Sequence, residues 1–163
     1  MNHRIWKALI IIGAICVVSF GMYYVAKIMA PGSYAYAESY QLSAPESKVI
    51  EAINAFKKAH PEMVVPDSSL AASDGRRDSS YWYFISIYYP KEEQTVLAWT
   101  RPAADSLNTE LAFVSINEGS GWKQINKDFS GEENKKLLTQ FEQRFVKKLG
   151  IKYSDNGNGM SLW

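Results

Sequence analysis

The chain has 163 residues, with 18 basic and 17 acidic side chains and a single cysteine. The first 37 residues hold three of the basic side chains and no acidic one, so the remaining 126 carry 15 positive against 17 negative charges. A nearly neutral region of this size fits a single domain, and it argues against nucleic-acid binding, which needs a clustered basic surface. One cysteine excludes an intramolecular disulfide.

The first predicted element is a membrane span. Residues 8–26 form a run of 19 uncharged residues, nine of them Leu, Ile, Val or Phe. As a helix, the run would be about 28 Å long, close to the hydrocarbon thickness of a bilayer. Arg4 and Lys7 precede it and only Lys27 follows directly, so the positive-inside rule places the N-terminus in the cytoplasm. We predict a single-pass signal anchor over residues 1–29 in a bacterial inner membrane, with the rest of the chain in the periplasm.

Two other interpretations of this stretch concern its processing. Lipid attachment at Cys16 is disfavoured because Ile15 stands where a small residue is needed. Signal-peptidase cleavage is the stronger rival, since Ala35-Tyr36-Ala37 fits the A-x-A pattern. Secretory apolar cores usually have about 7 to 15 residues, which favours a retained anchor here. Either way, the following domain lies outside the cytoplasm.

Residues 30–42 are expected to form a stalk, because Pro31-Gly32 ends the helix and no helical period follows. A helix is predicted from near Ser43, where Ser43 and Glu46 have the spacing of a capping box. It should end at His60, before a proline. Its apolar stripe comprises Val49, Ile50, Ile53 and Phe56.

Residues 61–80 show no sustained period, apart from a possible short edge strand at 63–65. Three strand patterns follow, and a fourth short one is possible. The "PKEE" turn between the first two predicts a hairpin in which Tyr89 lies opposite Gln94. The strands are expected at 81–89, 94–101, 110–117 and 122–125.

The last helix is predicted from Ser130, with a second capping box to Glu133 and a left-handed cap at Gly150. Residues 152–163 read as a flexible tail. The resulting fold is α+β over residues 43–151: helix, three- to four-stranded antiparallel meander, helix, after the N-terminal transmembrane helix.

Alternation along the predicted hairpin separates two faces of the sheet. The first face is aliphatic and suited to packing the helices. The second mixes large aromatic side chains with hydroxyl groups and an arginine, as interface hot spots do. The alternative is that the helices or the 61–80 loop cover these aromatics as core. The candidate binding residues are Trp82, Phe84, Tyr88, Trp99, Arg101 and, from a third strand of undetermined register, Phe113.

No catalytic set, metal-ligand cluster or phosphate-binding loop is recognised, and no cofactor is expected. The "DGRRD" segment at 74–78 reads as a solvated turn in which the two aspartates offset the arginines. A small-ligand site or an enzyme with a pocket between the sheet and the 61–80 loop remains the alternative. Its candidate residues are His60, Arg76, Arg77 and Arg101.

Several segments resemble, in their spacing, an uncharacterised family of small single-span bacterial membrane proteins. These are "FKKAHPE", "WYFISIYYP", "AWTRP", "LAFVSINEG", "WKQINKDF" and "FEQRF", between about residues 46 and 149. The resemblance implies a location and no activity. The sequence therefore predicts a non-enzymatic, membrane-anchored domain that binds a protein partner, as an immunity-type protein or as an accessory subunit of an envelope complex. It does not indicate the oligomeric state.

Overall fold

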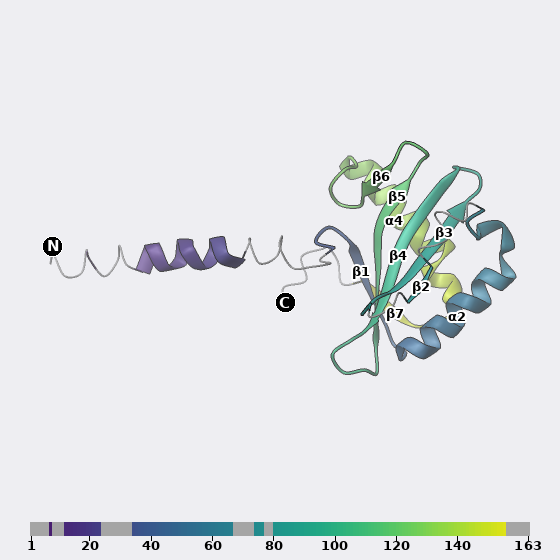
Figure 1. Ribbon diagram of the computed structural model, residues 1–163, viewed down its shortest axis with the longest axis horizontal. Coiled ribbons are helices and arrows are strands. Elements are labelled where there is room, and N and C mark those ends of the chain that lie inside the picture. The colour runs from purple at the N-terminus through teal and green to yellow at the C-terminus, as the bar shows by residue number, and fades with distance from the viewer. Residues whose placement is uncertain (1–6, 8–11, 24–33, 67–73, 77–79, 156–163) are drawn as a thin grey trace. The chain divides into compact units, whose positions relative to one another are not determined.

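The computed structural model describes residue 7 and residues 12–23, 34–66, 74–76 and 80–155 (Figure 1). The chain forms two compact units, residues 1–35 and residues 36–163.

In the first unit, residues 12–23 are helical, and their large apolar side chains, from Ile12 to Tyr23, are exposed. The rest of the predicted span, at 8–11 and 24–29, lies outside the described residues. Within the described part of the chain, no helix is both long and apolar enough to cross a membrane.

The second unit is an α+β domain built on an antiparallel sheet, as the sequence predicts (Figure 1). Its helices are α2 (Glu46–Ala59), η1 (Pro61–Met63), α4 (Gly131–Arg144) and η2 (Val146–Leu149). Its strands are β1 (Glu38–Leu42), β2 (Gly75–Arg76), β3 (Tyr83–Tyr89), β4 (Gln94–Pro102), β5 (Thr109–Asn117), β6 (Trp122–Gln124) and β7 (Tyr153–Asp155).

The sheet order is β2-β3-β4-β5-β1-β7, and β6 also pairs with β5. One edge of β5 therefore pairs with two different strands. Its residues 109–113 pair with β1, and its residues 115–117 pair with β6. The predicted hairpin is confirmed, with Tyr89 opposite Gln94 and Ile87 opposite Val96.

The predicted stalk is wrong for residues 38–42, and the predicted tail is wrong for residues 153–155. The former are β1, an interior strand between β5 and β7, and the latter are β7. In β1, Tyr40 and Leu42 are buried, and they alternate with half-buried polar residues. Both strands are too short to show a clear period on their own. Their partners also lie far away in the sequence, so no neighbouring hairpin indicates them.

The two capping boxes have different outcomes. Ser130 and Glu133 form the predicted box at α4. At α2, Pro45 holds the N-cap position without a side-chain cap, so the box at Ser43 is wrong. The Glu46 carboxylate instead accepts hydrogen bonds from Arg76 on β2 and from the Thr100 hydroxyl on β4, at 2.6 and 3.3 Å.

The 61–80 segment also differs from the prediction where it is described. The edge strand at 63–65 does not form, because Met63 ends η1 (Pro61–Met63) and residues 64 and 65 belong to no strand. Gly75 and Arg76 pair with β3 as β2, so this part of "DGRRD" is a strand and not a solvated turn. The Asp74 carboxylate accepts from Lys57 of α2 and, at 2.6 Å, from the Ser86 backbone N–H. Arg77 and Asp78 lie outside the described residues.

One extra residue in β5 sets the orientation of its side chains. Leu97 pairs with Ser115 but its neighbour Ala98 pairs with Phe113, so Val114 has no partner on β4 and forms a β-bulge. The Val114 carbonyl accepts from the Ile125 N–H at 3.0 Å. The bulge changes the alternation, so that Leu111, Phe113 and Ile116 all enter the core under α2 and α4.

The β3–β4 turn is fixed to the end of α4. Nη1 and Nη2 of Arg144 donate to the two oxygens of the Glu92 carboxylate, at 2.8 and 2.7 Å. The same guanidinium lies 5.1 Å from the centre of the Tyr89 ring, a cation–π distance. Tyr89 is almost fully buried, and this burial raises the pKa of its hydroxyl.

Deleting Val114 should destabilise the domain far more than Val114→Ala. The deletion restores strict alternation and moves Ile116 out of the core, whereas the substitution keeps the bulge. We expect an additional loss of about 2 to 5 kcal/mol in the free energy of unfolding, as for removal of a large buried aliphatic side chain. Urea unfolding of the full chain in detergent, followed by tryptophan fluorescence, measures both variants. Equal losses would show that the bulge does not set the alternation.

Glu92→Gln should destabilise the domain at neutral pH and not in acid. Hydrogen bonds from Arg144 lower the pKa of Glu92 in the folded chain. Its stabilising effect is therefore present above the unfolded pKa of about 4.3 and is lost as the pH falls through the lower folded pKa. Because the pair is partly exposed, the cost at pH 7 should be about 1 kcal/mol or less. Urea unfolding at pH 7 and at a pH below both pKa values tests this, with the exposed Glu93→Gln as control. A cost that is independent of pH would contradict it.

Candidate binding surface

The helices α2 and α4 pack on the first face of the sheet, and the second face is the candidate binding surface. Cross-strand pairing places its side chains in rows. One row runs Tyr88, Thr95, Asn117, Trp122, and the next runs Ser86, Leu97, Ser115, Gln124. Beyond the bulge, Phe84, Trp99, Ala112 and Ser39 form a third row.

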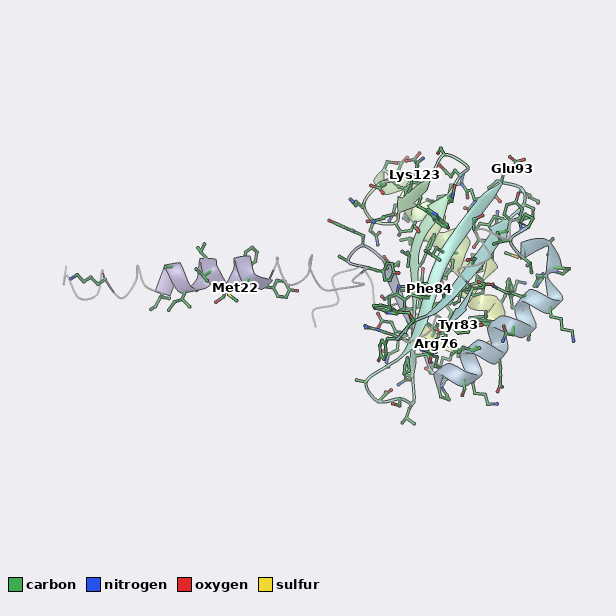
Figure 2. The ribbon with its side chains drawn as sticks, in the orientation of Figure 1. Met22, Arg76, Tyr83, Phe84, Glu93 and Lys123 are labelled. Carbon is green, nitrogen blue, oxygen red and sulfur yellow. The ribbon has the colours of Figure 1, made fainter. Side chains whose placement is uncertain are left out.

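The third row is interior. Phe84 and Trp99 are only 7% and 5% exposed, although no described helix packs on this face. The Trp99 ring lies 6.2 Å from that of Trp82, which is half-buried. In Figure 2, Phe84 lies on β3 near Arg76 of β2. Arg76 pairs with Tyr83, the residue before Phe84. For Phe84 and Trp99, the interpretation as core is the one that the burial supports.

Arg101 is engaged in an ion pair on this face. Its Nε donates to Glu110 on β5 at 2.6 Å, and the other Glu110 oxygen accepts from the Ser39 hydroxyl at 3.0 Å. Its guanidinium also lies 5.4 Å from the centre of the Trp99 ring. Glu110 is 9% exposed, so its carboxylate depends on these donors. This cluster joins β1, β4 and β5.

The assignment of Phe113 to the second face is wrong. Phe113 is fully buried on the first face and stacks on Phe141 of α4, with ring centroids 4.5 Å apart. Its register follows from pairing with Ala98, which the sequence leaves undetermined.

The Tyr88–Trp122 row (Tyr88, Thr95, Asn117 and Trp122) is accessible at Tyr88, Asn117 and Trp122, whereas Thr95 is buried. Tyr88 is half-buried and Trp122 is 42% exposed. With neighbouring strands about 4.8 Å apart, the two aromatic residues stand about 14 Å apart across two small polar side chains. Sequence reasoning missed Trp122. Its signal was its place at the start of the possible fourth strand, whose face is defined only by pairing with β5.

The residues of the enzyme alternative do not converge. The Nδ1 of His60 lies 3.1 Å from Glu62, and both side chains are substantially exposed at the end of α2. Arg76 binds Glu46 and the Tyr81 carbonyl oxygen, and Arg101 binds Glu110. Arg77 lies outside the described residues. Among the described residues, no three His, Cys, Asp or Glu side chains are placed to hold a metal ion.

Comparison with protein-family models, curated proteins and solved structures finds no match for this chain. The resemblance to single-span membrane proteins therefore stays a prediction.

Replacing Arg101 alone should cost more than replacing both members of its ion pair. Arg101→Met leaves the buried Glu110 carboxylate without its cation, and we expect a loss of up to about 3 kcal/mol. Adding Glu110→Gln removes the unpaired charge and should restore much of that loss. Urea unfolding of the wild type, both single variants and the double variant gives the coupling energy. Additive losses would show that the two side chains act independently.

Proposed function

We propose that the chain is a membrane-anchored domain of the bacterial periplasm that binds a protein partner through the Tyr88–Trp122 row. The observation that carries the proposal is that Trp122 is exposed, and Tyr88 and Asn117 partly exposed, around the buried Thr95 on a sheet face where no described helix packs. A tyrosine and a tryptophan flanking small polar groups have the composition of an interface centre, since each offers apolar area and a hydrogen-bonding group.

The order within the row supports a defined orientation of the partner. Thr95 and Asn117 lie on neighbouring strands between the aromatic residues, and the Asn117 side chain accepts a hydrogen bond from the Gly119 N–H. Leu97, half-buried in the adjacent row, extends the apolar area. Because strands hold these side chains, a partner would meet a preorganised surface and little ordering entropy would be lost.

The N-terminal sequence supports the location. Residues 12–23 form a helix with exposed apolar side chains, and they belong to the uncharged run at residues 8–26. A helix that is apolar all round is suited to lipid or to a protein core. Both specific versions, an immunity-type protein and an accessory subunit of an envelope complex, need an anchor and a surface of this kind.

Trp122→Ala should abolish partner capture without unfolding the domain. A tryptophan at an interface centre commonly contributes about 2 kcal/mol or more, which corresponds to roughly a 30-fold loss of affinity. A photo-crosslinking residue at the exposed position 124, beside Trp122 on β6, in the full chain expressed in its native host and activated in membranes, should give a discrete product. The same residue at position 107 is the control, since Leu107 is 73% exposed and lies in the β4–β5 loop.

Trp99→Ala separates binding from folding in this experiment. Because Trp99 is buried, we expect this variant to lose stability by about 3 to 5 kcal/mol, whereas Trp122→Ala stays folded. Equal crosslinking from positions 124 and 107, or a Trp122→Ala variant that binds as well as the wild type, would refute the proposed surface.

A further inference from the structure

We propose that the Ala37–Glu38 bond, which follows the A-x-A sequence, stays uncut in the mature protein because the fold encloses it, so the domain keeps its N-terminal helix. This inference rests on the proposed export of the domain, and it concerns how the anchor is retained rather than what the domain binds.

Both residues of the bond are buried. Ala37 is 6% exposed and Glu38 is 4% exposed. One side chain secures the peptide on both sides of the bond. Asn126 Nδ2 donates to the Tyr36 carbonyl oxygen at 3.1 Å and to a Glu38 carboxylate oxygen at 2.7 Å. In addition, Lys127 Nζ lies 5.4 Å from the centre of the Tyr36 ring. The sequence around the bond is therefore part of the folded domain.

Asn126 is itself held in place. Its backbone N–H donates to the Asn134 side chain on α4 at 2.8 Å, and its own side-chain oxygen accepts from Asn134. Its φ of 61° is the left-handed conformation, which asparagine tolerates better than most residues. The contact to Glu38 thus links the start of β1 to the first helix turns of α4.

Access by a protease would require β1 to leave the sheet. Glu38 lies opposite Phe113 of β5, and the later residues of β1 also pair with β7. Cleavage of a folded chain depends on the population of the locally opened state. An interior strand with partners on both edges opens less readily than a terminus or a loop tip.

Cleavage would also create a new charged group at the first residue of β1. The new α-amino group of Glu38 would have a pKa near 8 in a peptide and would be mostly protonated at neutral pH. The Asn126 side chain would lose the Tyr36 carbonyl as an acceptor. The structure around Glu38 is thus suited to a continuous chain.

The decisive experiment compares folded and unfolded full-length protein with purified signal peptidase in detergent. We expect cleavage after Ala37 to be at least about tenfold slower for the folded chain than for the chain held unfolded in a urea concentration that the peptidase tolerates. Asn126→Gly should speed cleavage of the folded chain, because it removes the side-chain donor and keeps the left-handed backbone free of strain. The control is Ser106→Gly, which changes another left-handed residue far along the chain from Glu38.

Three results would overturn the inference: equal cleavage of folded and unfolded wild type, no cleavage of the unfolded chain at this bond, or a mature protein from cells whose mass begins at Glu38. An intact mass for the 163-residue chain in membranes would support it. The outcome is separable from that of the partner proposal. A cut domain could still crosslink to its partner from position 124, and an uncut domain could fail to crosslink.

Discussion

The strand β5 is hydrogen-bonded to β4 on one edge and to both β1 and β6 on the other, and the bulge at Val114 separates these two partners. The extra residue keeps Leu111, Phe113 and Ile116 together in the core, where α2 and α4 cover them. The bulge also determines which residues share a row on the second face, because β1 and β6 pair with β5 on opposite sides of the bulge. The placement of the helices, of the candidate surface and of the first strand therefore follows from one irregularity in one strand.

The parts of the fold that the sequence predicts are those specified by neighbouring residues. The four-residue turn fixes the β3–β4 register, and a local capping box starts α4. The short strands β1, β2 and β7 pair with residues distant in sequence, and a segment of two to five residues carries no detectable period. At α2, a tertiary contact replaces the predicted capping box. The Glu46 side chain forms an ion pair with Arg76 instead of capping the helix.

The candidate site was predictable only in part, for the same reason. Alternation correctly separates the faces of β3 and β4, but the bulge reverses the face expected for Phe113 relative to Ile116. Alternation also says nothing of burial, so it treats Trp99 and Tyr88 alike, although Trp99 is buried and Tyr88 is half-buried. Trp122 could be assigned to the face only once β6 was known to pair with β5.

The two ends of the second face have different physical roles, and this difference limits what the domain can do. At one end, the partly exposed Arg101 and the buried Glu110 and Trp99 form a cluster that joins β1, β4 and β5. Its side chains cannot be reoriented toward a ligand without leaving the Glu110 carboxylate unpaired. At the other end, Tyr88 on β3 is half-buried and Trp122 on β6 is 42% exposed. The cluster around Glu110 holds β1 in the sheet, and β1 leads directly to the N-terminal segment. A rigid platform at one end of the face thus supports an accessible aromatic row at the other, which is the arrangement that preorganised recognition requires.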